Sequence, residues 1–233
     1  MANFDFGKAT AELPILRDFI DFVNKQSSVY MDCLNGFAGN TVRIERQVAR
    51  VTFPARKELR DGQDVVVWDS MEDPSKPDII HNSIRKSSTY LADNSETGFN
   101  EQQICWAIIV FMFAHWDEEV RPAIAEVREV EPNDIKIDAL GDLRILRKAV
   151  VHAKGIVTAV EHAKLKKMME LVKPDETLAL SHDQMHKVFV MVKNAIGQIV
   201  MHYTGGLSGA PSADKIVDIA IQNVCPSRER RDV

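Results

Sequence analysis

The stretch GDLRILRKAVVHAKG, residues 141–155, gathers side chains that could bind and cleave a phosphate ester. Arg147 could hold a phosphate through two parallel hydrogen bonds, and His152 could move a proton because an imidazole titrates near neutral pH. Arg144 and Lys148 lie within one turn of Arg147 on any helix and could bind neighbouring phosphates. The same residues could also form an ordinary solvated helix face, so their surroundings must decide between the two interpretations.

The basic character of this stretch is local. Between Asp134 and Lys173 the chain has nine Lys and Arg residues against five Asp and Glu, although the whole chain of 233 residues carries a formal net charge of −5. The preceding segment DEEVRPAIAEVREVE, residues 117–131, is strongly acidic. An acidic chain is not expected to coat nucleic acid non-specifically, but a local basic region can still bind a phosphate.

The spacing of Arg147 and His152 limits what one copy of the chain can do. They are five residues apart, and at about 100° per residue they diverge by roughly 140° around a helix. One copy therefore converges poorly on a small substrate. Two copies facing each other across a two-fold axis could converge well, because such a contact brings each pair against its twin.

The string RKAVVH, residues 147–152, has the form Arg, four residues, His, and it falls late in an expected helix. Together with the preceding FMFAHWDEEVRPAIA, residues 111–125, it resembles the signature of the HEPN superfamily, and the resemblance covers residues 77–203. It implies an all-α domain that acts as a metal-independent endoribonuclease, with its active site in a dimer cleft. His152 would then serve as general acid or base, and Arg147 would stabilise the charge on the phosphate.

The resemblance also implies roles for the neighbouring charged residues. The basic side chains would hold flanking phosphates, namely Arg144, Lys148 and Lys154. The acidic side chains would orient the arginines, namely Asp142 and either Glu118 or Glu119. The chain departs from the family at two of these positions, because Lys148 stands where many members have a small polar residue and Lys154 stands where a toxin subgroup has a modified tyrosine. Control by modification of that tyrosine is therefore not expected.

The resemblance implies RNA as the substrate, attack by the 2′-OH as the chemistry, and no metal or other cofactor. The natural setting would be a toxin or an anti-phage abortive-infection effector, with an antitoxin protein as a further partner. An alternative is a catalytically inactive HEPN-like dimer that binds RNA, a nucleotide or a protein partner. A purely structural helical protein is a further alternative.

His182 and His186 are four residues apart, a spacing that can bind zinc. The sequence has no HExxH motif at this pair, so we expect two exposed histidines and not a zinc site.

The chain has three cysteines, Cys33, Cys105 and Cys225, which are far apart and form no CxxC. We therefore expect neither a disulfide framework nor a zinc site, and we expect the protein to be cytoplasmic.

Residues 1–14 show no basic segment followed by an apolar core, so no signal peptide is expected. The most apolar run, ICWAIIVFMFA (residues 104–114), falls well short of the ~20 residues of a membrane helix. We expect a buried core helix at this run and no association with a membrane.

The N-terminal residues 1–76 are expected to form a helical lobe. Apolar residues recur at helical spacing from Leu13 onwards. Gly36 and Gly39 are expected to end this helix. The proline-rich loop DPSKPD, residues 73–78, is the expected boundary between this lobe and the rest of the chain.

A small β-hairpin is expected within this lobe. Its strands would be QVARVTF (residues 47–53) and QDVVVW (residues 63–68), which contain β-branched residues. The Asp61–Gly62 pair would lie between them as a turn signal. An extension of the helix through TVRIERQVARV, residues 41–51, is the alternative.

Residues 77–205 are expected to form an all-α, HEPN-like helical bundle, followed by a polar tail at 206–233. Its helices are expected at residues 78–93, 98–127, 133–155, 159–172 and 181–205, and short loops between helices are typical of a bundle. Pro122 would kink or interrupt the second helix, and Gly155 would end the third. The expected N-caps are side chains that accept backbone N–H bonds, namely Asn133 or Asp134 and Ser181.

Overall fold

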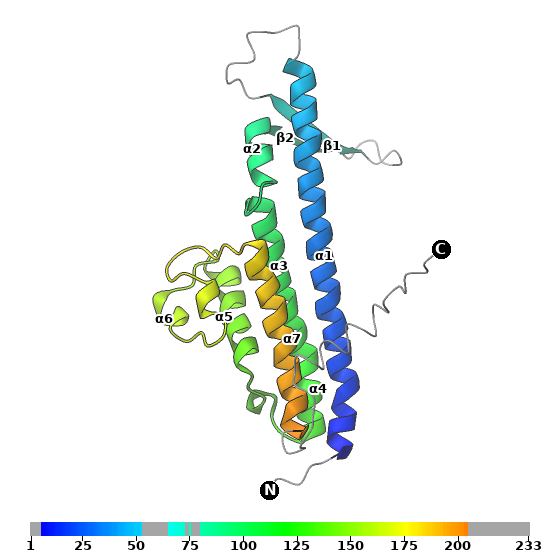
Figure 1. Ribbon diagram of the computed structural model, residues 1–233, viewed down its shortest axis with the longest axis vertical. Helices are drawn as coiled ribbons and strands as arrows, with labels where there is room; N and C mark the ends of the chain where they lie inside the picture. The colour runs from blue at the N-terminus through cyan, green and yellow to red at the C-terminus, as the bar shows by residue number, and fades with distance from the viewer. Residues whose placement is uncertain (1–5, 53–64, 73–74, 76–79, 205–233) are drawn as a thin grey trace, which may run out of the picture. The chain divides into compact units, whose positions relative to one another are not determined.

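The computed structural model describes residues 6–52, 65–72, 75 and 80–204 (Figure 1). Its α-helices are α1 (Phe6–Thr52), α2 (Ser87–Asp93), α3 (Phe99–His115), α4 (Arg121–Arg128), α5 (Asp138–His152), α6 (Ala159–His162) and α7 (His182–Thr204). Shorter elements are the π-helical segment η2 (Trp116–Val120), the 3-10 turns η3 (Pro132–Asp134) and η4 (Met169–Leu171), and the strands β1 (Val66–Glu72) and β2 (Ile80–Lys86). The prediction of a mostly helical fold with an N-terminal helix is confirmed.

The described residues form two compact units. Those up to Ser28 and from Trp106 onwards make the first unit, and Val29–Cys105 make the second, so α1 and α3 each contribute to both. The boundary expected after residue 76 falls between the paired strands β1 and β2, inside the second unit. The tail expected at residues 206–233 lies outside the described residues.

Helix α1 passes through Gly36 and Gly39 and continues to Thr52. A Cβ atom at either glycine would meet no other atom within 4 Å. The two glycines are therefore open positions on the helix surface and not turns, and the prediction that they end the helix is wrong.

The last turns of α1 pack within the second unit. Ile44 is fully buried in a cluster with Val67 of β1 and Tyr90 of α2. The helical alternative for residues 41–51 is therefore confirmed. The strand predicted at residues 47–53 is wrong, because this part of the chain is the end of α1 as far as the structure describes it.

The hairpin is present, but it pairs other residues than the sequence predicts. Strand β1 runs antiparallel to β2, with Val66 opposite Lys86 and Glu72 opposite Ile80. The proline-rich segment at residues 73–78 connects these two strands. It therefore joins the arms of a hairpin and does not separate two domains.

The helix expected over residues 78–93 begins only at Ser87. The backbone N–H of Ser87 donates to the carbonyl of Val65 at 2.7 Å, and the N–H of Val65 donates to Ser87 Oγ at 3.2 Å. This reciprocal contact extends the strand pairing up to the first residue of α2, so residues 80–86 belong to the hairpin. The turn expected at Asp61–Gly62 lies outside the described residues.

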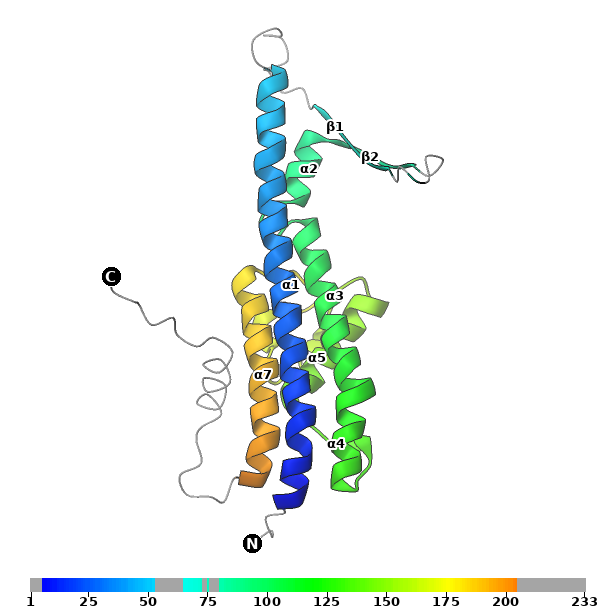
Figure 2. The same cartoon turned by 90° about the vertical axis from the view of Figure 1, so that its right-hand side faces the viewer.

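The first unit is a bundle of helices that pack side by side around an apolar core (Figures 1 and 2). Its members are α1, α3 and its continuation α4, α5, and α7. Each of them contributes fully buried side chains, among them Phe19 of α1, Ile109 of α3, Ile124 of α4, Leu143 of α5 and Val188 of α7. The expected bundle is thus present, and it also includes the first turns of α1.

Helix α3 contains the apolar run of residues 104–114, which is largely buried, as predicted. It passes into η2, and α4 then begins at Arg121 with Pro122 in its first turn. Proline lacks the N–H that a regular helix needs, and its ring clashes with the carbonyl four residues earlier. The expected interruption at Pro122 is therefore confirmed.

None of the helices in the described part of the chain combines the length and the apolar character that spanning a bilayer requires. Cys33 and Cys105 are free thiols, and Cys225 lies outside the described residues.

Candidate functional site

Helix α5 carries the residues with a predicted chemical role, and its apolar face anchors it in the core. The buried positions recur at helical spacing and include Ala139, Leu143, Leu146 and Ala149. The helix begins at Asp138 after an extended residue, Ile137. The expected N-caps Asn133 and Asp134 lie instead in η3, so that prediction is wrong. The opposite face of α5 is left for solvent or a ligand.

The exposed face of α5 aligns His152 with side chains expected to bind phosphate. Gly141, Ile145, Lys148 and His152 follow one stripe of the helix, because they are spaced by four, three and four residues. Arg144, Lys148 and His152 are exposed, whereas Arg147 is half-buried. Arg147 and His152 point about 140° apart around the helix, so one copy of α5 does not bring them together.

The turn after α5 depends on Gly155, which has a φ of 81°. Its N–H donates to the carbonyl of Ala149 at 2.9 Å. A Cβ atom on Gly155 would lie 2.5 Å from the ring of Trp106, whose Nε1–H donates to the Leu178 carbonyl at 2.9 Å. The predicted helix end near Gly155 is confirmed, and Lys154, predicted to bind phosphate, is exposed in the same turn.

Asp142 holds a loop rather than an arginine. Its carboxylate is buried and accepts backbone N–H bonds from Lys166 at 3.0 Å, Lys167 at 2.6 Å and Met168 at 2.9 Å. These N–H groups point at a carboxylate, so they cannot pair with carbonyls of a helix. This explains why the helix expected over residues 159–172 is reduced to α6 and η4, and it replaces the arginine-orienting role expected of Asp142.

Two of the three acidic residues of η2 have partners of their own. Glu118 and Glu119 are both exposed, and the Glu119 carboxylate lies 3.1 Å from Nδ1 of His115. Asp117, which was not predicted, pairs with Arg121 at 2.8 Å. Within the described residues neither glutamate is bonded to an arginine of α5, so the structure does not bring the predicted supporting pair to the predicted site.

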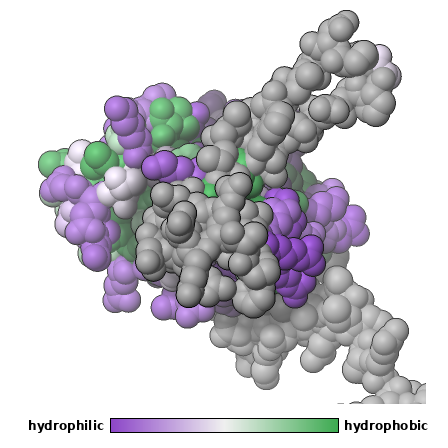
Figure 3. Space-filling model, turned by 90° about the horizontal axis from the view of Figure 1, so that it is seen from above, coloured by the Kyte–Doolittle hydropathy of each residue, from purple (hydrophilic) through white to green (hydrophobic). Residues whose placement is uncertain are grey.

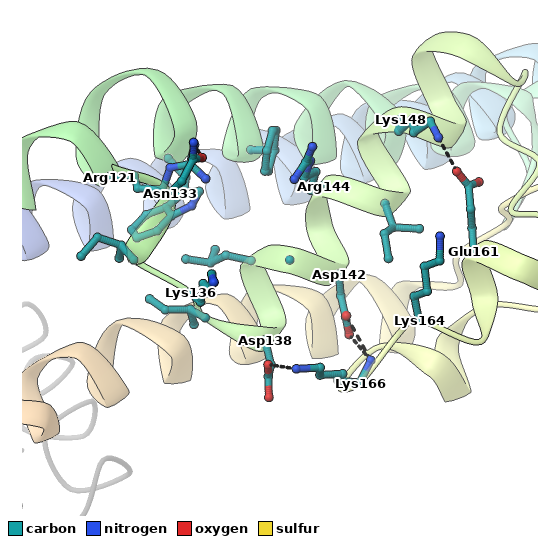
Figure 4. Close-up of a pocket in the computed structure, with 17 residues that line it drawn as sticks. Arg121, Asn133, Lys136, Asp138, Asp142, Arg144, Lys148, Glu161, Lys164 and Lys166 are labelled. Carbon is teal, nitrogen blue, oxygen red and sulfur yellow. Dashed lines mark hydrogen bonds and ion pairs between the residues drawn. The ribbon is translucent and has the colours of Figure 1, made fainter. Parts of the chain in front are cut away.

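A pocket of about 540 Å³ opens beside α5 (Figure 4). Its charged lining residues come from α5 and from the segments before and after it, and they are Arg121, Lys136, Asp138, Asp142, Arg144, Lys148, Glu161, Lys164 and Lys166. Lys148 pairs with Glu161 at 2.7 Å, and Lys166 pairs with Asp138 at 2.7 Å. The hydrogen bond to Asp138 raises the pKa of Lys166. These pairs neutralise only part of the positive charge.

Six Lys and Arg residues line the pocket against three Asp and Glu. Among the described residues, the side chains of Lys136, Arg144 and Lys164 form no ion pair, and all three are exposed. Lys136 and Lys164 were not predicted as site residues. The high density of basic residues between Asp134 and Lys173 is the signal that could have found them, although only folding brings them beside α5.

The structure thus divides the predicted site into two parts. Arg144 and Lys148 line the pocket, and Arg147, His152 and Lys154 do not. Among the described residues, no group of three or more His, Cys, Asp or Glu side chains is arranged to hold a metal ion.

Comparison of the chain with protein-family models, with curated proteins and with solved structures found no match in any of the three. A functional assignment therefore depends on the residues of this chain and their geometry.

Proposed function

We propose that this chain is a cytoplasmic, homodimeric endoribonuclease that cleaves RNA without a metal ion. The observation that carries the proposal is the exposed stripe of α5, on which His152 follows Lys148 by one helical turn. Within the described residues the side chains of Arg147 and His152 have no hydrogen-bond or ion-pair partner, so both are available to a substrate. The resemblance of residues 147–152 to the HEPN signature supports the same activity.

The chemistry needs a base, an acid and a group that binds the phosphate. A neutral His152 would accept the proton of the 2′-OH, whose oxygen then bonds to the adjacent phosphorus. The bond to the 5′-oxygen breaks, and that oxygen takes the proton that the same His152 has accepted from the 2′-OH. Arg147 would stabilise the charge on the phosphate oxygens. The products would be a 2′,3′-cyclic phosphate and a 5′-hydroxyl, and general acid–base catalysis of this kind typically contributes ~10²–10⁴-fold.

A second copy is part of the proposal because Arg147 and His152 of one helix point apart. Exposed apolar side chains flank His152 along the chain, and these are Val151, Ile156 and Val160, with 46%, 38% and 70% exposure. Apolar side chains that are exposed together often mark interaction surfaces. Figure 3 shows apolar surface, in green, interspersed with hydrophilic side chains on one face of the molecule. We propose that the second copy docks beside His152.

The biological setting that we propose is a toxin or an anti-phage abortive-infection effector. A nuclease of this kind would harm its own host, so an antitoxin protein would be a natural partner. The basic face of α5, with Arg144 and Lys148 exposed, is the surface that such a partner would have to cover.

RNA cleavage in EDTA tests the proposal. We predict that the wild-type protein cuts RNA and leaves 2′,3′-cyclic phosphate ends, and that His152→Ala and Arg147→Ala each lose at least about a hundredfold in rate. His186→Ala is the matched control, because His186 is an exposed histidine on α7. The His186→Ala protein should cleave RNA like wild type.

Cleavage that requires added metal, or equal loss in His186→Ala, would contradict the mechanism. A wild-type protein that binds RNA without cutting it would instead be the inactive RNA-binding dimer, which the unpaired cations of the pocket also support.

A further inference from the structure

The pocket beside α5 has an excess of positive charge that the protein itself leaves uncompensated. Its three acidic residues are already engaged, since Glu161 and Asp138 pair with lysines and Asp142 accepts backbone N–H bonds. Lys136 and Lys164 are left without an ion pair among the described residues, as is Arg144. An exposed pocket with three uncompensated cations favours an anionic ligand.

The uncompensated cations are spread along the pocket. Figure 4 shows Lys136 toward the end that Arg121 lines, Lys164 toward the end that Lys148 lines, and Arg144 between them. A compact anion such as a single phosphate would engage only part of this row. A nucleic-acid strand carries one negative charge per nucleotide along its backbone, and so matches cations that are set apart.

The pocket also has an apolar part to its lining. It is lined by Phe113, Trp116, Ile135, Ile137, Leu140 and Ile145. A volume of about 540 Å³ lies within the ~300–1,000 Å³ of typical ligand pockets, which combine apolar walls with a few placed polar groups. Such a wall suits the flat apolar face of a base, and the rim suits its phosphates.

The pocket also leads toward His152. Gly141, Ile145 and Lys148 line the pocket and lie on the same stripe of α5 as His152. Lys148 and His152 are four residues apart, which is a rise of about 6 Å along the helix. A strand seated in the pocket and running along α5 would therefore arrive at His152 within about one helical turn.

We propose that this pocket is the subsite for a nucleotide of single-stranded RNA beside the scissile phosphate. Lys136, Arg144 and Lys164 bind phosphates, and the apolar wall holds the base. The inference rests on the proposed function in taking His152 as the centre of cleavage. Binding of RNA by the pocket does not depend on cleavage, so the two can fail separately.

The first test measures binding of a short, fluorescently labelled single-stranded RNA to His152→Ala protein by anisotropy over a series of salt concentrations. Adding Lys164→Ala should weaken binding about tenfold, as expected for loss of a charge-assisted bond of ~1.5 kcal/mol. It should also reduce the slope of log K against log salt by about 0.7, the value for one phosphate contact on a single strand.

Lys167→Ala is the matched control for that variant. Lys167 is an exposed lysine of the same segment, and its side chain does not line the pocket. The Lys167→Ala protein should bind RNA like the His152→Ala protein from which it is made. Equal weakening by Lys164→Ala and Lys167→Ala would overturn the proposal, because a diffuse basic surface would then account for binding.

A second variant blocks the pocket without removing charge. Gly141 lines it, and a Cβ atom there would meet nothing within 4 Å, so Gly141→Leu should fold and fill the space. We expect this variant to lose RNA binding at least tenfold while its thermal unfolding midpoint stays level or rises, since leucine favours a helix over glycine. Unchanged RNA binding by folded Gly141→Leu protein would overturn the proposal.

Competition separates the ligand classes. Unlabelled single-stranded RNA should displace the probe, whereas a nucleoside 5′-monophosphate and inorganic polyphosphate should do so only weakly. Equal displacement by the monophosphate would make the pocket a site for free nucleotides, and equal displacement by polyphosphate would make it a bare anion site. Either result would overturn an RNA subsite.

The same variants distinguish failure of this inference from failure of the proposed function. If the wild-type protein never cuts RNA but Gly141→Leu and Lys164→Ala impair binding, cleavage is refuted and the pocket stands. If RNA is cut, and Lys164→Ala and Gly141→Leu leave KM and the cut sites unchanged in the His152-containing protein, the subsite is refuted and cleavage stands.

Discussion

Gly155 determines how α5 ends and, with it, where His152 lies. At a φ of 81° any side chain is strained by about 1–2 kcal/mol, and a Cβ atom would lie 2.5 Å from the ring of Trp106. We predict that Gly155→Ala lowers the free energy of unfolding by about 2–4 kcal/mol, because backbone strain and overpacking add. Urea denaturation followed by tryptophan fluorescence measures this change.

Gly36→Ala is the control for that substitution. Gly36 lies inside α1, and a Cβ atom there would meet nothing within 4 Å. Alanine should therefore raise the free energy of unfolding by about 0.5–1 kcal/mol through its higher helix propensity. A similar loss in both variants would argue against the role given to Gly155.

Elements with local signals were predictable from the sequence. Helix α7 begins where Ser181 and Gln184 cap each other, with Ser181 N–H donating to Gln184 Oε1 at 2.9 Å and Gln184 N–H donating to Ser181 Oγ at 3.3 Å. The hairpin and the segment after α6 depend on distant partners instead. Asp142 accepts bonds from residues more than twenty positions further along the chain, and no periodicity reveals such a partner.

The same distinction applies to the candidate site. Arg147 and His152 stand on one helix, so their spacing alone marks them. Lys136 and Lys164 join Arg144 at one pocket only because the chain folds back over α5. Sequence reasoning could therefore name the residues proposed for chemistry, but it could not assemble the pocket beside them.

At the scale of elements, a buried polar contact joins α1 and α3 within the second unit. The Tyr30 hydroxyl donates to Glu101 Oε1 at 2.7 Å, and the Thr97 N–H donates to Oε2 at 2.6 Å. Burial raises the pKa of Tyr30. Burial and the charge of Glu101 raise the pKa of Cys105 to about 12. In the folded chain the Tyr30 phenol and the Cys105 thiol therefore stay protonated at pH values above their ordinary pKa values.

This contact should make the protein sensitive to alkaline pH. In the unfolded chain Cys105 loses its proton near its ordinary pKa of 9.0, so between about pH 9 and pH 12 the unfolded state binds fewer protons than the folded state. Stability should therefore be full below pH 9 and fall as the pH rises. We predict a shallower fall for Cys105→Ala in urea denaturation across this range, and a fall as steep as in wild type would disprove the assignment.

At the scale of the whole molecule, the proposed active site has to be assembled from two copies of α5. Each copy brings the exposed cations Arg144 and Lys148 to the same face. Two such faces repel each other, because like charges at close range are unfavourable. An RNA strand between them would neutralise this repulsion, so the substrate itself would favour the arrangement in which it is cut.

If the site takes Arg147 from one protomer and His152 from the other, two inactive variants should restore each other. In a heterodimer of Arg147→Ala and His152→Ala, one site has both residues and the other has neither. An equal mixture that exchanges subunits freely should therefore recover about a quarter of wild-type cleavage, because half the dimers are mixed and each has one intact site. The double variant Arg147→Ala/His152→Ala, mixed with either of the two single variants, should recover no cleavage. Continued inactivity of the mixture, with subunit exchange verified by light scattering of tagged protomers, would mean that each site uses residues of one chain only.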